Sequence, residues 1–306
     1  MLDDERTLGA TGLPVSPIGL GLAALGRPGY INLGHGRDLA GKTDVAALER
    51  RSHEVLDAAY AAGVRHFDAA RSYGRAEEFL ASWLQGRGIP AGAVTVGSKW
   101  GYVYAADWRI DADQHEVKDL SAANLRRQAS ESRALLGYHL ALYQIHSATL
   151  ESGVLDDLEV RDDLERLRQQ GLAIGLTVSG SRQRETIERA LEVGGFDTAQ
   201  ATWNLYERSA GPALAAAHEA GLGVIVKEAL ANGRLIGTVP DSVAIAAALA
   251  QPWADVVLSG AATVAQLESN LSAIHVDSDE GLDAELAELE EDRDSYWATR
   301  AALKWN

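Results

Sequence analysis

The chain has 306 residues, of which 46% are hydrophobic and 24% charged, a balance typical of globular proteins with a large core. It has 44 acidic and 28 basic residues, and its formal net charge of −16 argues against nucleic acid or an anionic membrane as a partner. The absence of cysteine excludes disulfides, thiolate nucleophiles and cysteine metal ligands. The N-terminus "MLDDERTLGATG" lacks an apolar core, and no run approaches the roughly 20 apolar residues of a membrane helix. We therefore expect a cytoplasmic protein.

Short apolar runs alternate with longer amphipathic stretches along the chain. The amphipathic stretches predict helices, as in 48–63, 120–137 and 161–171, each ending at a glycine. Strands with little polar alternation, each separated by a helix, predict a parallel sheet covered on its outer face. Eight such units favour a closed (β/α)8 barrel over an open doubly wound sheet. The strand-like runs are 15–21, 64–70, 93–99, 140–146, 172–179, 197–204, 222–229 and 255–261.

Three segments depart from this repeat. Residues 26–44 are Gly-rich and charged, and 100–120 form a long aromatic insertion. We expect both to shape a substrate pocket, with Tyr30 as one contact, because aromatic faces suit a hydrophobic or sugar-like ring; packing on the barrel rim is the alternative. The tail from Asp277 predicts a helix that closes the bottom of the barrel or meets another subunit. We see no linker, so 1–306 is expected to be one α/β domain, a TIM barrel with an N-terminal β-hairpin and a C-terminal helix.

Polar side chains stand at the ends of the predicted strands, where a barrel builds its active site. Taken singly, each has a simpler interpretation, such as a turn cap, a solvated rim charge or a core histidine. Their joint occurrence at successive strands favours a shared site, because buried ionisable groups need partners. These residues are Asp68, Lys99, His146, Ser179, Asn204 and Lys227, with Gln200 inside the sixth strand.

Four residues suit proton and hydride transfer at a carbonyl. Tyr73 follows Asp68 by five positions, and a free tyrosine, with a pKa of about 10, is a weak acid near neutrality. The ammonium of Lys99 would lower that pKa, and Asp68 would hold Lys99 in place. His146 would donate a hydrogen bond to the substrate carbonyl as charge develops on its oxygen.

These motifs resemble the aldo-keto reductase family. "GVRHFDAARSYGRAEEFLASWL" is similar to its first signature, "VGSKWG" to the segment with its lysine and "LYQIHS" to the segment with its histidine. "LPVSPIGLGLAALG", "GLAIGLTVS", "AQATWNLYER" and "VVLSGAATVAQLESNLSAI" follow in the family's order, so the resemblance covers roughly residues 6 to 275.

The resemblance implies a (β/α)8 barrel that reduces aldehydes or ketones with a nicotinamide cofactor and without metal. Its catalytic tetrad would be Asp68, Tyr73, Lys99 and His146. Ser179 and Gln200 would hold the nicotinamide carboxamide, and 260–270 would lie at the adenosine phosphate end, where a helix start at Thr263 offers N–H groups. The expected cofactor contacts are Gly21, Leu22, Asp68, Ser179, Gln200, Lys227, Leu230, Gly233, Gly260, Ala261, Gln266 and Asn270.

Three positions depart from the family pattern. Gly180 stands where the family usually has Asn after Ser179. Lys227 stands where many members place a tyrosine that stacks on the nicotinamide. Trp100 or Trp203 would supply an aromatic face in its place; the alternatives for both tryptophans are a substrate wall or core packing. The segment 260–270 has Gln266 and Ser269 but no cation for a 2′-phosphate. NADPH is therefore expected by family habit, with NADH or dual use open.

Two other functions fit the same residues. One is a Schiff-base aldolase in which Lys99 attacks a carbonyl, although a paired aspartate would keep Lys99 protonated. The other is a non-catalytic, nucleotide-binding regulatory subunit with the same fold. The sequence leaves open the physiological substrate, the reaction direction and the oligomeric state.

Overall fold

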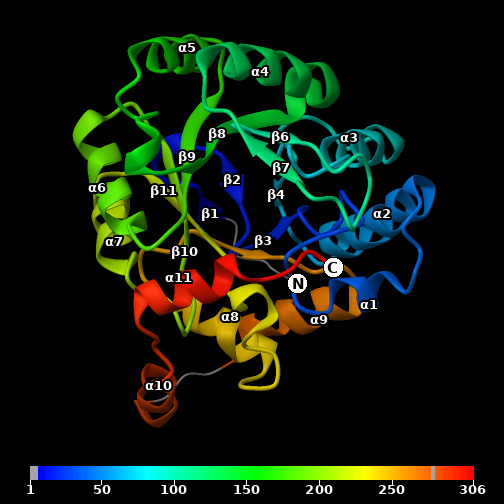
Figure 1. Ribbon diagram of the computed structural model, residues 1–306, viewed down its shortest axis with the longest axis vertical. Helices are drawn as coiled ribbons and strands as arrows, with labels where there is room; N and C mark the ends of the chain where they lie inside the picture. Colours follow the sequence, from blue (N-terminus) through cyan, green and yellow to red (C-terminus); the bar gives the residue numbers. More distant parts are fainter. Residues whose placement is uncertain (1–5, 277–279) are drawn as a thin grey trace.

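The computed structural model describes residues 6–276 and 280–306, and its centre is a closed barrel of eight parallel strands (Figure 1). Each strand pairs with the next barrel strand along the chain, and the last pairs with the first. The predicted (β/α)8 barrel is therefore confirmed. The barrel strands are β3 (Ile18–Gly21), β4 (His66–Asp68), β5 (Thr95–Trp100), β8 (Leu140–Ala148), β9 (Ala173–Val178), β10 (Thr198–Thr202), β11 (Gly223–Lys227) and β12 (Val256–Ser259).

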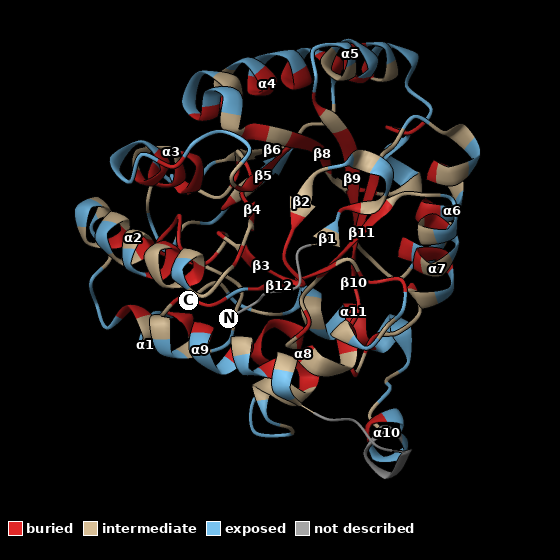
Figure 2. Ribbon diagram, turned by 180° about the vertical axis from the view of Figure 1, so that it is seen from behind, coloured by how far each residue is buried: buried red, intermediate tan, exposed pale blue. Residues whose placement is uncertain are grey.

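Helices surround the barrel and turn their buried faces toward it (Figure 2). Side-chain caps begin several of them, including Asp44, Ser121 and Asp157, each of which accepts backbone N–H groups of the first turn. Among residues 6–276 and 280–306 no helix is long and apolar enough to cross a membrane. The barrel helices are α2 (Val45–Ala61), α3 (Ala76–Gly86), α4 (Ala122–Leu136), α5 (Leu158–Gln169), α6 (Gln183–Val193), α7 (Gly211–Glu219), α8 (Asp241–Leu249) and α9 (Val264–Leu271).

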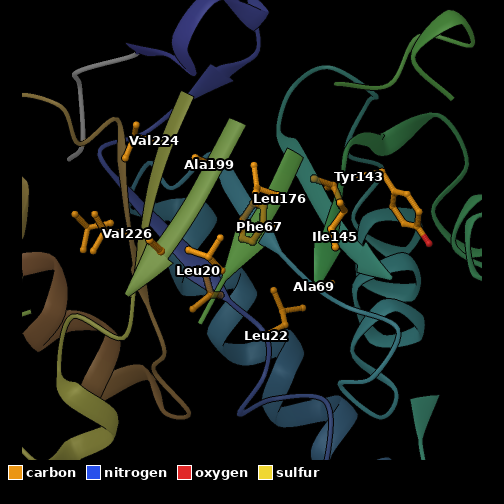
Figure 3. Packing of buried hydrophobic residues seen from close by; sticks show 14 of the residues in the cluster. Leu20, Leu22, Phe67, Ala69, Tyr143, Ile145, Leu176, Ala199, Val224 and Val226 are labelled. Atoms are coloured by element: carbon orange, nitrogen blue, oxygen red, sulfur yellow. The ribbon is translucent and has the colours of Figure 1, made fainter. Parts of the chain in front are cut away.

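Successive residues of each barrel strand face opposite sides of the sheet. Outward-facing residues such as Leu20, Phe67 and Leu176 are fully buried in the layer between strands and helices (Figure 3). The residues that face the lumen are more polar. On β4 they are His66 and Asp68, and on β5 they include Lys99, two residues after Gly97. Burial of the apolar outer face stabilises the barrel, so the lumen can carry polar side chains that do not contribute to a hydrophobic core.

The N-terminal hairpin closes one end of the barrel. Strands β1 (Arg6–Thr7) and β2 (Pro14–Val15) are antiparallel, and Leu8 and Val15 pack on lumen residues that include Leu142 and Ile225. The predicted strand 15–21 is wrong at its start, because Val15 pairs with the hairpin while β3 begins at Ile18. Ser16 makes the break, since its hydroxyl donates to the Ile18 carbonyl at 2.7 Å.

The C-terminal segment covers the opposite end, the mouth where the parallel strands finish (Figure 1). Helix α10 (Glu280–Ala287) precedes α11 (Arg293–Ala301), and residues 303–306 continue along the first loop. Tyr30 and Asn306 exchange two backbone hydrogen bonds of 3.1 Å. The expectation that this helix closes the bottom of the barrel is therefore wrong, because the hairpin already occupies that end.

Two insertions frame the mouth. The predicted loop 26–44 contains one short helix, α1 (His35–Leu39), and 100–120 forms a hairpin of β6 (Tyr102–Tyr104) and β7 (Glu116–Lys118). Both insertions contribute side chains to the cavity described below, as expected.

Candidate active site

A buried ion pair lies in the lumen just below the mouth. Lys99 Nζ donates to Asp68 Oδ2 and, at 3.0 Å, to the Ala69 carbonyl. The other Asp68 oxygen accepts from Gln144 Nε2 at 3.2 Å and from Gln200 Nε2 at 3.4 Å. Lys99 and Asp68 are 1% and 2% exposed, so each charge depends on these partners. The arrangement makes Lys99 the donor of a buried ion pair with Asp68.

Tyr73 and His146 meet edge to face beside this pair. Their ring centres are 5.4 Å apart, and the Tyr73 hydroxyl is 3.5 Å from His146 Nε2. Lys99 Nζ lies 5.1 Å from the centre of the Tyr73 ring. The Ser72 hydroxyl is 3.4 Å from His146 Nδ1, so it can donate to that nitrogen and leave the proton on Nε2. The structure thus brings together the four side chains that the sequence predicted as a tetrad.

Burial sets the protonation of both rings. It raises the pKa of Tyr73 well above its ordinary value, and Asp68 raises it further, while Arg27 lowers it. Burial also lowers the pKa of His146 well below its ordinary value, and Lys99 and Lys227 add to this effect. At neutral pH the resting site therefore holds a protonated phenol and a neutral imidazole.

Arg27, which the sequence analysis missed, lies beside the tetrad. It is 2% exposed, and its Nη1 donates to the Ser72 carbonyl at 2.9 Å and to Glu116 at 2.7 Å. Its guanidinium carbon is 5.1 Å from the centre of the Tyr73 ring. In the sequence Arg27 is one of several basic residues of a Gly-rich loop, and nothing local indicates its contact with Tyr73.

A cavity of about 420 Å³ opens above the tetrad. Tyr73 and His146 line it, and Lys99 lies behind Asp68 in the wall. Most of the residues expected to touch a cofactor or substrate also line it, from strands on both sides of the barrel. These are Gly21, Tyr30, Asp68, Ser179, Gln200, Lys227, Leu230, Gly233, Gly260, Ala261, Gln266 and Asn270.

Three expected contacts lie elsewhere. Leu22 is fully buried and packs in the outer core, although its neighbours Gly21 and Ala23 reach the cavity (Figure 3). Trp100 is fully buried in the same core, and Trp203 packs edge to face on Trp253 with ring centres 6.0 Å apart. The two indoles therefore belong to the core, the third of the interpretations left open, and correct the expectation of a substrate wall.

Asn204 has a structural place near the mouth. Its amide donates to the Glu228 carbonyl at 3.0 Å and to the Tyr296 hydroxyl at 2.9 Å. Its side-chain oxygen accepts from the N–H groups of Tyr206 and Glu207, each at 3.0 Å. Because every polar atom of its side chain is engaged, Asn204 ties α11 to the end of β10 instead of facing the cavity.

An ion pair fixes α11 over the mouth. Arg300 binds both carboxylate oxygens of Glu228, and Thr202 donates to Glu228 at 3.1 Å. Burial raises the pKa of Glu228, but Arg300 and Lys227 outweigh burial and lower that pKa to about 2. Trp305 extends this cover, stacking on His115 at 4.0 Å. No local pattern in the sequence marks a pair separated by 72 positions.

The far end of the cavity suits a polar ligand. The side-chain oxygens of Asn232 and Asn270 are buried and have no hydrogen-bond partner among residues 6–276 and 280–306. Gly260 borders open space, so no side chain fills the wall there. Helix α9 begins after Thr263, as predicted, and the Thr263 hydroxyl caps it by accepting the Gln266 N–H at 3.2 Å. These features fit an elongated group with donors and acceptors, such as a dinucleotide.

An acid stands beside this end. Gln266 Nε2 donates to Asp38 Oδ2 at 2.9 Å, and Gln266 Oε1 accepts the Ala262 N–H at the same distance. The side chain expected to meet an adenosine phosphate is therefore already bonded to a carboxylate. Gly180, at the position of the family's usual Asn, has a φ of +92° and lacks a side chain to replace that contact.

A (β/α)8 barrel with a phenol, an imidazole and a buried ion pair at the floor of its mouth is a barrel enzyme site of the kind that works at the carboxyl ends of the strands. A model of the Aldo/keto reductase family matches residues 17–241, so the chain belongs to the aldo/keto reductase family.

Individual relatives agree with this assignment. The chain is similar to the uncharacterized oxidoreductase YqkF of Bacillus subtilis, with 23% identity over 76% of this chain and 66% of that protein, slightly under two thirds of its length. A putative aldo-keto reductase from Pseudomonas aeruginosa, PA4992, is 29% identical with a TM-score of 0.69, covering 89% of this chain and 94% of the other. AKR11C1 from Bacillus halodurans, in its holo form, shares the fold at 19% identity and a TM-score of 0.70, covering 94% and 96%.

Proposed function

We propose that the protein interconverts aldehydes or ketones and alcohols with a nicotinamide dinucleotide, using Tyr73 as the general acid or base. The observation that carries the proposal is the meeting of Tyr73, His146 and the Lys99–Asp68 pair at the floor of one cavity. Four side chains from three strands and a loop would not converge in the lumen for packing alone, because buried polar groups are costly.

Each member of the tetrad has a distinct role in reduction. Tyr73 gives its hydroxyl proton to the carbonyl oxygen as negative charge develops there. His146 is neutral and donates from Nε2 to the same oxygen, with Ser72 holding the tautomer. Lys99 stabilises the phenolate that remains, and Asp68 keeps Lys99 charged and in place.

The cavity wall offers partners for the cofactor. When bound, a reduced nicotinamide supplies the hydride. Ser179 and Gln200 would hold its carboxamide, and Asn270 and Gly260 would lie along the phosphates. The Asp38 carboxylate beside Gln266 disfavours a 2′-phosphate by like-charge repulsion, which supports use of NADH alongside NADPH.

The substrate is expected to be a small carbonyl compound. Tyr30, Tyr102 and Trp305 surround the mouth with aromatic faces, and Arg27 and Glu116 add polar groups among them. This mixture suits a compound with an apolar or ring-shaped body and polar substituents. The structure disfavours the aldolase alternative, because the Lys99 nitrogen is engaged by Asp68 and the Ala69 carbonyl, and Lys99 is not among the residues that line the cavity.

The test is a comparison of the wild type with Tyr73→Phe. Titration with NADH and NADPH, followed by the fluorescence of the seven tryptophans, should give equal affinities for the two proteins. Aldehyde reduction should fall by at least about a hundredfold in the variant, as expected for loss of a general acid. A wild type that binds nucleotide but reduces no aldehyde in a broad panel would instead favour the regulatory subunit.

A further inference from the structure

Lys227 is a cavity-lining cation with no direct partner among the residues that the structure describes. It ends β11 on the lumen side, two residues after the lumen residue Ile225, and it lines the same cavity as Tyr73 and His146. Arg27 and Arg300, which also line the cavity, each bind a carboxylate. Within residues 6–276 and 280–306, no atom accepts a hydrogen bond from Lys227 Nζ and no carboxylate lies within 4.0 Å of it.

The surroundings of Lys227 lower its pKa and so increase the fraction of neutral amine. Burial is the main cause that lowers the pKa of Lys227, which falls to about 8. The charges of Arg300 and Lys99 lower this pKa as well, whereas those of Glu228 and Asp68 raise it. At pH 8 about half of such an amine is neutral, roughly a hundredfold more than for an ordinary lysine. A neutral amine in a partly apolar pocket, next to other cations, is the form that attacks carbonyls.

The other lysines of the chain are poorer candidates. There are five lysines in all, and Lys99 is paired with Asp68. Lys118 donates to the Ser147 carbonyl at 2.8 Å, and Lys42 and Lys304 are exposed to solvent. A carbonyl compound that enters the cavity therefore meets one uncommitted amine.

We propose that Lys227 is a site of reversible imine formation with small aldehydes in the nucleotide-free protein. The Lys227 nitrogen bonds to the carbonyl carbon, and the carbonyl oxygen leaves as water with the two amine hydrogens. The imine carbon then occupies the space above the tetrad, so a bound nucleotide and the imine exclude each other; this last clause rests on the proposed function. The site is distinct in role from Tyr73, because imine formation needs neither hydride transfer nor the phenol.

The experiment traps the imine on the full chain. The protein is incubated with propanal or benzaldehyde and sodium cyanoborohydride, whose hydride converts the imine to a stable secondary amine, and the adducts are located by peptide mass mapping. We expect Lys227 to be labelled at least tenfold faster than Lys42 and Lys304, with a rate that rises through pH 8. Saturating NADH or NADPH should slow labelling of Lys227 but not of the exposed lysines. Equal labelling of all lysines, or labelling of Lys99 in place of Lys227, would overturn the inference.

Matched variants complete the test. Lys227→Arg keeps the charge but cannot form an imine under these conditions, so the cavity label should disappear, whereas Lys118→Arg should leave it unchanged. If Lys227→Arg does not fold, the ratio of labels in the wild type still decides. Aldehyde turnover without a Lys227 adduct sinks this inference alone, and a Lys227 adduct in a protein without reductase activity sinks the proposed function alone.

Discussion

The guanidinium carbon of Arg27 lies 5.1 Å from the centre of the Tyr73 ring, and the same guanidinium donates to the carbonyl of the neighbouring Ser72. The same group is 5.1 Å from the Tyr30 ring and 4.7 Å from the Trp305 ring. Arg27 thus joins the first loop, the loop after β4 and the C-terminal segment around the phenol. Its charge lowers the pKa of Tyr73, while its ion-pair partner Glu116 raises it.

Replacing Arg27 should change the pH dependence of the reaction. In Arg27→Met the pKa of Tyr73 rises, so alcohol oxidation, which needs the phenolate, should require higher pH. The rate of alcohol oxidation at neutral pH should fall by about tenfold or more, the equivalent of about 1.4 kcal/mol of transition-state stabilisation. The measurement is kcat for oxidation and for reduction across the pH range.

The opposite substitution supplies the control. Glu116→Gln removes a charge that raises the pKa of Tyr73, so alcohol oxidation should reach its full rate at lower pH than in the wild type. Arg75→Met removes an arginine that is 47% exposed and pairs with Glu78, and it should leave the profile unchanged. A profile that does not move in Arg27→Met, or that moves the same way in Glu116→Gln, would contradict an electrostatic role.

Asp38 should govern the choice between the two nucleotides. Asp38→Asn keeps a hydrogen-bond acceptor for Gln266 but removes the negative charge beside it. Affinity for NADPH should rise by about fivefold relative to NADH, the effect of roughly 1 kcal/mol of repulsion. Fluorescence titration with both nucleotides measures the ratio directly.

The control for net charge is Asp113→Asn, an exposed acid in the β6–β7 insertion. It should leave the ratio of the two affinities as in the wild type. If the NADPH to NADH ratio is the same in all three proteins, Asp38 does not face the 2′ position of a bound nucleotide.

The Glu228–Arg300 pair should stabilise the protein in a pH-dependent way. Glu228→Gln is expected to lower the free energy of unfolding at pH 7 by at most about 3 kcal/mol, because the pair is mostly buried. The folded-state pKa of about 2 lies below the ordinary value of 4.5, so this stabilisation is complete above about pH 4.5 and is lost as the pH falls toward 2.

Urea unfolding at pH 7, 5 and 3 tests this prediction. The difference between wild type and Glu228→Gln should be similar at pH 7 and 5 and smaller at pH 3. Glu151→Gln, which breaks an exposed pair with Arg182, should change stability by less than about 0.5 kcal/mol at every pH. A Glu228→Gln difference that grows on acidification would show that the sign is wrong.

Much of the fold could be predicted because barrel strands and helices leave local patterns. Runs such as 172–179 are short and mostly apolar, as a buried parallel strand requires. Helix α2 covers most of its predicted stretch 48–63, although it begins three residues earlier, at Val45, after the N-cap Asp44. The break between Val15 and Ile18 was missed because both residues are buried and apolar, and they are separated by the pairing of Val15 with Arg6 and the turn at Ser16.

The candidate site was only partly predictable. Asp68, Lys99 and His146 end successive strands, so their convergence follows from the parallel barrel. Arg27 and Glu228 could not be predicted, because their roles depend on partners 89 and 72 positions away, Glu116 and Arg300. Trp100 and Trp203 were expected near the cavity but lie in the core. An aromatic residue at a strand end can face either side of the sheet, and both of these face the outer core.

By itself the sequence determined the barrel and the chemical types at its mouth, because strand periodicity and strand order are local properties that a closed parallel sheet converts into one shared edge. Only the tertiary structure decided which charges neutralise one another. Arg27 and Arg300 acquired carboxylate partners, and within the described part of the chain Lys227 did not, because ion pairing depends on distances of a few ångströms between segments that lie far apart in the chain.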